Sequence, residues 1–315
     1  MSVILLTAIG SASAASAIAA YQAQGHRVIG CNIYPQSWNV ESTQVDAFFQ
    51  ALPAKDTNAY LNQMEEAVRR EQVEFLIPLT DVEVDVLCEQ KSRFAALGCT
   101  VCTPDAPATR LCRNKRRMAK VLADAGICRT IPTRSPYGYQ PTEADFPMIL
   151  KPESGRSSQG LQIVHSIGAF QSALSMRSDY IAQPYLDGDV FTVDVARDVC
   201  GNVQALARQE LLRTVNGLGT TVSILPEHPL NAICAAIARQ ADIVGVVNME
   251  FIHHNDDYYF LEVNPRYSGG LGFSLLAGVN FAQLELLCHQ DKSIGSRPRV
   301  SPMVLTRQVS FVRTK

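Results

Sequence analysis

The sequence predicts an α/β protein whose amino-terminal domain is Rossmann-like, with a parallel sheet. The first 33 residues follow a strand, helix and strand pattern, and this βαβ order builds parallel sheets. The chain has 315 residues, of which 47% are hydrophobic and 18% are charged. That length and composition allow two or three packed units rather than one average domain.

The charge balance indicates what kind of partner the protein has. A net charge of −2 provides no basic field for nucleic acid or an anionic membrane surface, so we expect small-molecule partners, no nucleic acid and no membrane. Nine scattered cysteines, an odd number, favour a reduced, cytoplasmic protein over a disulfide framework. Residues 3–14 resemble a signal peptide, but no Lys or Arg precedes the apolar run, and a helix and strand follow it. We therefore expect no signal peptide.

The first domain is predicted from short apolar runs separated by small residues. We expect a strand at 3–9, a helix at 14–24 and a strand at 27–33. Gly10 and its small neighbours form a weakened dinucleotide motif without the full glycine spacing, so an NAD site is only weakly indicated. A helix near 60–70 and a strand at 75–78 follow, and the strand ends in Thr80, Asp81 and Glu83. These side chains either contact a ligand at the sheet edge or cap a helix.

The middle of the chain contains two basic features. A strand at 99–102 closes the first domain, and a basic helix at 114–127 follows. The strand at 148–152 carries Lys151, which is unfavourable in a buried strand unless an anion meets it. The polar loop 153–160 lies between this strand and the next. It is either an ordinary hairpin loop or a loop whose N–H groups cover phosphates.

The later elements form a run of strands. A helix at 167–176 precedes a strand at 180–186, where Pro184 interrupts pairing and leaves backbone groups for a ligand. The remaining predicted elements are strands at 190–196 and 203–208, a helix at 230–244, a helix at 273–290 and a strand at 303–311.

The most informative stretch is an acidic hairpin. Residues 246–252 and 258–263 read as strands around a polar turn at 255–257. With the turn centred on Asp256, Glu250 lies opposite Glu262 and Asn248 opposite Asn264. Side-chain alternation places these four residues and Arg266 on one face, and the other face is formed by Met249, Phe251, Leu261 and Val263. Facing carboxylates repel, so we expect cations between them, and oxygen ligands suit Mg²⁺.

Taken together, these motifs resemble the ATP-grasp superfamily. The resemblance is carried by Lys115, Lys151, the loop 155–160, Gln183 and the segment Glu262-Val-Asn-Pro-Arg266. It is strongest to the ATP-binding half of the carbamoyl phosphate synthetase large chain and to small stand-alone carboxylate-amine ligases. It implies a Rossmann-like domain at 1–107, an ATP-grasp small or lid subdomain at 108–187, and an α+β metal- and substrate-binding subdomain at 188–315.

The resemblance also implies a role for each motif residue. Arg266, Lys151 and Arg208 would be catalytic. Glu250 and Glu262 would bind one Mg²⁺, and Glu262 with Asn264 a second, with Mn²⁺ as a substitute. Val190 stands where related proteins often have an acid that contacts the ribose, so Asp187 or Asp189 would make that contact. The other ATP-binding residues would be Lys115, Ser154, Gly155, Ser157, Ser158, Gly160, Gln183, Tyr185 and Leu186.

The activity that the resemblance implies is ATP-dependent amide formation through an acyl phosphate. The substrates would be a small, amino-acid-like carboxylate and an amine, and a homodimer is compatible with the family. The alternatives are carboxyphosphate and carbamate chemistry, or a nucleotide-binding regulatory protein without turnover. Arg213 could equally be a solvated loop charge. The residues implied to hold the substrate are Arg208, Arg213, Tyr267, Ser268, Gly269 and Gly270.

Overall fold

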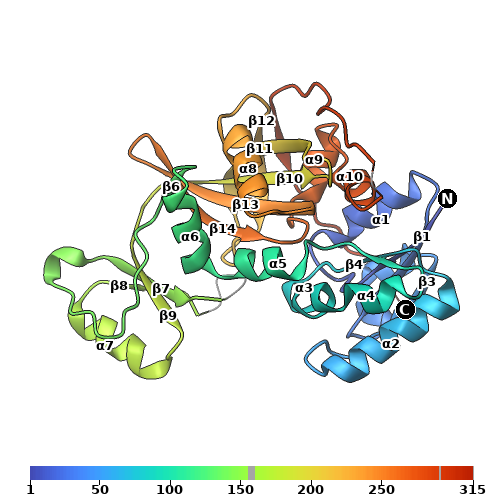
Figure 1. Ribbon diagram of the computed structural model, residues 1–315, viewed down its shortest axis with the longest axis horizontal. Helices are drawn as coiled ribbons and strands as arrows, with labels where there is room; N and C mark the ends of the chain where they lie inside the picture. Colours follow the sequence, from blue (N-terminus) through green and yellow to red (C-terminus); the bar gives the residue numbers. More distant parts are fainter. Residues whose placement is uncertain (155–159, 291, 315) are drawn as a thin grey trace.

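The computed structural model describes residues 1–154, 160–290 and 292–314, and three sheets organise them. The amino-terminal sheet and the three-stranded sheet lie on either side of helices α5 and α6, and the seven-stranded sheet lies above them (Figure 1). The predicted α/β fold class, with an amino-terminal parallel-sheet domain, is confirmed.

The amino-terminal sheet is parallel throughout, in the order β3-β2-β1-β4-β5. The chain order reverses between β1 and β4, and ligands of open α/β sheets bind at such a point, beyond the carboxyl ends of the strands. Its strands are β1 (Val3–Leu6), β2 (Arg27–Asn32), β3 (Ala47–Gln50), β4 (Phe75–Ile77) and β5 (Thr100–Val101). Its helices and 3₁₀ turns are α1 (Ala14–Gln22), η1 (Gln36–Trp38), η2 (Val40–Thr43), α2 (Thr57–Glu71), α3 (Asp81–Leu87), η3 (Cys88–Gln90) and α4 (Lys91–Ala95).

The three-stranded sheet is a small unit with its own core. It is antiparallel, in the order β8-β7-β9, and α7 packs on it through Phe170 and Ala173 against Met148 and Leu150. Its elements are η4 (Glu143–Asp145), β7 (Met148–Pro152), β8 (Gln162–Val164), α7 (Ile167–Met176) and β9 (Tyr180–Pro184).

The seven-stranded sheet has the order β15-β12-β11-β10-β13-β14-β6 and carries helices on both faces. Helix α8 packs on one face. On the other face, α9 and α10 share a core with α1 and β1, which joins this sheet to the amino-terminal domain. Its elements, with the two linking helices, are α5 (Ala106–Arg113), α6 (Lys115–Asp124), β6 (Arg129–Thr130), β10 (Asp189–Arg197), β11 (Val203–Arg213), β12 (Gly219–Leu225), α8 (Leu230–Gln240), β13 (Gly245–His254), β14 (Asp257–Asn264), α9 (Leu271–Leu276), α10 (Phe281–Cys288) and β15 (Met303–Thr306).

The acidic hairpin has the predicted pairs of acids and amides, although the pairing next to the turn is shifted by one residue from the predicted one. Glu250 pairs with Glu262, and Asn248 pairs with Asn264. The turn is Asn255-Asp256, with positive φ values of 49° and 63°, as two-residue hairpin turns require. The prediction for Leu261 is wrong, because the pairing skips it and Phe251 pairs with Phe260. This bulge puts Phe260 in the core and leaves Leu261 half-buried.

Some predicted boundaries also differ. The single helix predicted at 273–290 is two helices, α9 and α10, separated near Gly278, whose φ is 94°. A residue in this left-handed conformation ends a helix. Strand β11 continues to Arg213 rather than ending at Arg208, and β15 ends at Thr306. The longer β11 places Arg213 on the large sheet, beside the acidic hairpin.

Candidate active site

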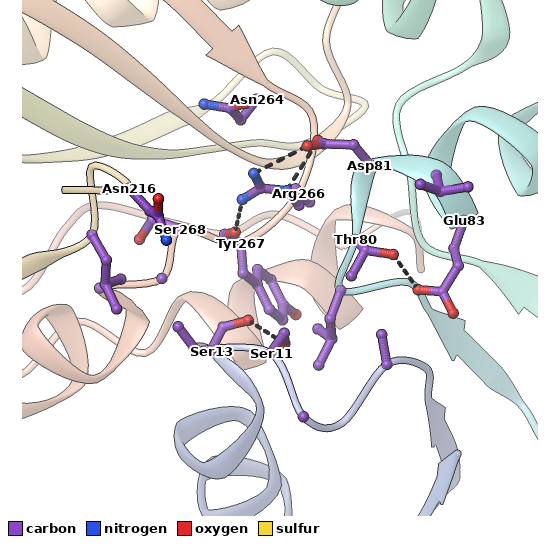
Figure 2. A pocket seen from close by; sticks show the side chains of 18 of the residues that line it. Ser11, Ser13, Thr80, Asp81, Glu83, Asn216, Asn264, Arg266, Tyr267 and Ser268 are labelled. Carbon is purple, nitrogen blue, oxygen red and sulfur yellow. Dashed lines mark hydrogen bonds and ion pairs between the residues drawn. The ribbon is translucent and has the colours of Figure 1, made fainter. Parts of the chain in front are cut away.

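A cleft of about 1210 Å³ lies between the amino-terminal domain and the large sheet. Figure 2 shows Ser11, Ser13 and Thr80 on the amino-terminal side, Asn264 and Arg266 on the side of the large sheet, and Asp81 bonded to Arg266. The amino-terminal wall follows from the sheet topology, because it consists of turns beyond the carboxyl ends of β1 and β4. The predicted residues that line the cleft are Arg208, Arg213, Glu250, Glu262, Asn264, Arg266, Tyr267, Ser268, Gly269 and Gly270.

Each of the two facing carboxylates of the hairpin forms an ion pair with a basic side chain. The Lys115 Nζ atom lies 3.2 Å from Glu262, and the Arg213 Nη2 atom lies 3.1 Å from Glu250. The Asn264 amide donates to Glu262 over 3.1 Å and to the Asn248 side-chain oxygen over 3.3 Å. In this structure the charges of Lys115 and Arg213 therefore compensate the two carboxylates.

The two carboxyl groups differ in acidity. Burial, and then the charge of Glu262, raises the pKa of Glu250 to about 7. Burial also acts to raise the pKa of Glu262, but the Lys115 and Lys151 ammonium groups outweigh it and the pKa is lowered. The pair therefore holds one firmly ionised carboxylate and one proton-binding carboxyl near neutral pH, an oxygen donor set suited to Mg²⁺.

Lys151 faces this cluster from the three-stranded sheet. Its pKa falls to about 8, mainly through burial, although Glu262 acts in the opposite direction. Among residues 1–154, 160–290 and 292–314, its ammonium makes no hydrogen bond or ion pair. A half-buried cation of this kind is suited to an anionic ligand.

Strand β9, which pairs with the Lys151 strand β7, carries the predicted base-binding residue Gln183, and Tyr185 follows its end. Gln183 is 4% exposed and donates its amide N–H to Thr133 over 2.6 Å. Its side-chain oxygen is buried without a partner in the described part of the chain, and this unused acceptor fits a donor such as an amino group. The Tyr185 N–H donates to the Pro147 carbonyl, so it is not available to a ligand in this structure.

None of the predicted nucleotide residues that the structure describes, Lys115, Lys151 and Gln183 included, is among those that line the large cleft. Ser154 and Gly160 are exposed at the two ends of the polar loop, while Leu186 is half-buried. Asp189 is exposed and accepts a hydrogen bond from Gln209 over 2.9 Å. The predictions for Gly155, Ser157 and Ser158 lie outside the described residues.

Arg266 is held by an acid that the sequence did not assign to it. The carboxylate of Asp81, at the start of α3, accepts from Nε of Arg266 over 3.0 Å and from Nη2 over 3.2 Å. Asp81 is 3% exposed, and Arg113 also lies 3.6 Å from it. The sequence placed Asp81 at a ligand-binding edge, and the structure adds that it orients Arg266.

Arg208 has a different environment from the one predicted. Its side chain is 2% exposed, and its guanidinium lies 2.8 Å from Asp194 and 3.1 Å from Glu210. A β carbon at Gly270 would lie 2.8 Å from Nη2 of Arg208, so the loop packs directly on the guanidinium. The carboxylates of Asp194 and Glu210 already compensate the charge of Arg208, so its guanidinium is not available to bind a substrate carboxylate. Glu210 lies two residues after Arg208 on β11, and Asp194 lies on the neighbouring strand β10, but nothing in the sequence marked either acid.

The loop after Arg266 presents mainly backbone to the cleft. The hydroxyl of Tyr267 shares a buried 2.6 Å hydrogen bond with that of Tyr21, so this side chain belongs to the core. Ser268 is 5% exposed and lines the cleft, and its hydroxyl has no partner among the described residues. Gly269 packs against Leu218, which a β carbon would approach to 2.4 Å.

Comparisons with known sequences agree with this architecture. Residues 176–311 match a family described as ATP-grasp in the biosynthetic pathway with Ter operon. The chain is 25% identical to pyruvate carboxylase of Bacillus subtilis over 172 residues, 48% of this chain and 15% of that protein. It is 24% identical to the carbamoyl phosphate synthase large chain of Haemophilus ducreyi over 212 residues, 61% of this chain and 20% of that protein. The chain thus spans a fifth or less of the length of these curated relatives.

Solved structures share the whole fold at low identity. Biotin carboxylase of Campylobacter jejuni, in a complex with β,γ-ATP, has a TM-score of 0.76 and 17% identity, covering 93% of this chain and 72% of that one. N5-carboxyaminoimidazole synthetase of Staphylococcus aureus, complexed with ADP, has a TM-score of 0.74 and 16% identity, covering 98% and 82%. L-amino acid ligase of Bacillus licheniformis has a TM-score of 0.72 and 14% identity, covering 92% and 74%.

No helix among the described residues is long and apolar enough to cross a membrane. The matches and the three-sheet architecture agree with the motifs in the sequence. This chain has the ATP-grasp fold, and its resemblance to the ATP-grasp superfamily is confirmed.

Proposed function

We propose that this protein is an ATP-dependent carboxylate-amine ligase. The observation that carries the proposal is the pairing of Glu250 with Glu262 beside Lys115 and Lys151. Facing carboxylates next to two ammonium groups form a site for both a divalent cation and an anion. Mg²⁺ with the phosphates of ATP has that combination of charges.

The residues present fit these ligands. Glu250, Glu262 and Asn264 offer oxygen donors only, as Mg²⁺ prefers, and the same three residues would hold one or two ions. Lys115 and Lys151 would hold phosphates, and the unused Gln183 oxygen would accept from the adenine amino group. When bound, Mg²⁺ supplies charge neutralisation of the phosphates.

The reaction would proceed in two displacements. A substrate carboxylate oxygen attacks the γ-phosphorus, the bond to the β-phosphate oxygen breaks, and ADP leaves. The amine nitrogen then attacks the acyl carbon, phosphate leaves, and the nitrogen loses a proton as the amide forms. Arg266, fixed by Asp81, would stabilise charge on the transferring phosphoryl group. The substrate carboxylate would bind at the loop formed by Ser268, Gly269 and Gly270, near Arg213. Arg208 would hold this loop in place.

The named neighbours support ATP-dependent chemistry on carboxylates. One is an L-amino acid ligase, and others are carboxylases or a carboxyaminoimidazole synthetase. The sequence relatives, a pyruvate carboxylase and a carbamoyl phosphate synthase chain, support a second candidate, in which bicarbonate is the carboxylate that is phosphorylated.

The test is an ADP-release screen over pairs of carboxylates and amines, with bicarbonate included as a carboxylate. We expect ADP release that requires ATP, Mg²⁺ and one pair, and loss of at least about 100-fold in kcat for Glu262→Gln, since a metal ligand is removed. Lys120→Met, on the exposed side of α6, is the control. Turnover that survives unchanged in Glu262→Gln would refute the metal site. The absence of any thermal stabilisation by ATP with Mg²⁺ would refute nucleotide binding.

A further inference from the structure

The loop after β2 carries an exposed aromatic pair in the large cleft. Tyr34 is 52% exposed and Trp38 is 72% exposed. Their rings stack with centroids 5.9 Å apart and planes at 27°, and both residues line the cleft that also contains the acidic hairpin. Exposed aromatic rings that line a concave site are typical of ligand-contacting surfaces.

The loop beneath the rings is firmly held. The Trp38 N–H donates to the Pro35 carbonyl over 2.9 Å, which closes η1. The buried Asn39 side chain donates to the same carbonyl over 3.0 Å, and the Ser42 hydroxyl donates to the Gln36 carbonyl over 2.9 Å. The exposure of the rings therefore results from a well-bonded loop that presents them, rather than from a poorly packed segment.

This loop and the turn after β1 form one wall. A β carbon on Gly10 would lie 2.7 Å from Nδ2 of Asn32 and 3.0 Å from Oδ1 of Asn39, so glycine permits the close contact. The Thr314 hydroxyl donates to the Ser37 carbonyl over 2.6 Å, and Val312 also lines the cleft. The carboxyl-terminal segment thus borders the rings on another side.

Polar groups on the large-sheet side also line this cleft, and we call them the polar wall. They are the guanidinium of Arg213, the exposed amide of Asn216 and the Ser268 hydroxyl. A ligand that spans the cleft would therefore place polar groups on that wall and a flat apolar group on the rings.

We infer that one substrate carries a planar, mainly apolar group, such as an aromatic ring, that packs on Tyr34 and Trp38 while its carboxylate or amine reaches the polar wall. That the polar end of this substrate is a carboxylate or an amine rests on the proposed ligase function. Because of the stacked ring contact, a planar group should bind with about fivefold higher affinity than a puckered group of the same size.

The chain contains a single tryptophan, so Trp38 fluorescence reports directly on this surface. The full chain is titrated with L-phenylalanine, with L-cyclohexylalanine as a puckered ring of similar size, and with L-alanine. We expect a saturable change with L-phenylalanine at a concentration about fivefold lower than with L-cyclohexylalanine, and no change with L-alanine. Tyr34→Ala should weaken the L-phenylalanine response about fivefold. Met176→Ala, at a 74% exposed position on α7, should not alter it.

The same preference is then measured by turnover. In the ADP-release screen, Trp38→Ala should remove the advantage of planar over puckered substrates, and Trp38→Phe should retain it. An equal response to both rings, no response to either, or an unchanged preference in Trp38→Ala would overturn the inference while leaving the ligase proposal intact. A ring-selective fluorescence change without any ADP release would instead overturn the ligase proposal and leave the aromatic surface in place.

Discussion

Asp81 and Arg266 are 185 residues apart in the chain and form a two-point ion pair, with nitrogen–oxygen distances of 3.0 and 3.2 Å. Asp81 begins α3 in the amino-terminal domain, and Arg266 follows the acidic hairpin. The pair therefore couples the position of the proposed phosphoryl-stabilising residue to the domain on the other side of the cleft (Figure 2).

Replacement of Asp81 by Asn should reduce both stability and turnover. The buried acid would no longer compensate Arg266, which costs about 3 kcal/mol of unfolding free energy for a pair of this burial. As a positioning residue, it should lower kcat by about tenfold or more while the KM for ATP changes little, since ATP contacts are retained. Denaturant unfolding and ADP-release kinetics measure the two effects. Asp105→Asn, at an exposed surface pair with Lys91, is the control, and an unchanged kcat in a folded Asp81→Asn protein would contradict the role.

The acidity of Glu250 predicts a pH dependence of Mg²⁺ binding. Its pKa in the folded protein is raised from 4.5 to about 7, so the fold binds this proton more tightly than the unfolded chain does. Without metal, that contribution to stability is fully present below about pH 4.5 and is lost as pH rises through about 7. Protons compete with Mg²⁺ for the same oxygens, so the rise in Tm caused by Mg²⁺ with ATP should increase from about pH 6 to about pH 8.

Glu250→Gln provides the matched test of that pH effect. The neutral amide has no carboxyl proton to lose, so at about pH 8 in EDTA the variant should be at least as stable as the parent protein. Its Tm should gain little from Mg²⁺ and ATP at any pH. A pH-dependent gain of the parental size in this variant would show that Glu250 is not the titrating ligand.

Lys151 should be important for ATP binding and dispensable for the fold. Its pKa is lowered to about 8, which means that the folded protein disfavours the charged form and that Lys151→Met relieves this cost. We expect an unchanged or higher Tm without ligand. The KM for ATP should rise about 10- to 100-fold, because a charge-assisted contact to phosphate is lost. Lys120→Met, at a 75% exposed side chain paired with Asp124, should alter neither quantity.

The contact between Gly270 and Arg208 should tolerate no side chain. A β carbon there would lie 2.8 Å from Nη2 and 3.0 Å from Cζ, so Gly270→Ala must displace the guanidinium from its bonds to Asp194 and Glu210. We expect a loss of about 1–3 kcal/mol in denaturant unfolding. Gly168→Ala, where no atom lies within 4 Å of the added carbon, should unfold like the parent protein. Parental stability in Gly270→Ala would show that the loop can move away from Arg208.

Much of the fold could be predicted because it depends on local patterns. The βαβ order of residues 3–33 identified the parallel sheet. A turn centred on Asp256 predicted that Glu250 faces Glu262, and this pair forms because a bulge shifts the register by one residue after the Asn255-Asp256 turn. The bulge at Leu261 could not be predicted, because it depends on which of two neighbouring apolar residues, Phe260 or Leu261, fits the core under α8. Burial in a specific core outweighs alternation there.

The sequence by itself determined which residues we propose for the site, since Lys151, Gln183, Glu250, Glu262 and Asn264 are recognisable by type, spacing and strand position. Tertiary structure decided which charges meet. It paired Arg266 with Asp81, enclosed Arg208 between Asp194 and Glu210, and placed Tyr34 and Trp38 in the same cleft as the polar wall. The physical reason is that strand and turn preferences act over a few residues, whereas ion pairs and clefts form between segments that only the packed sheets bring together.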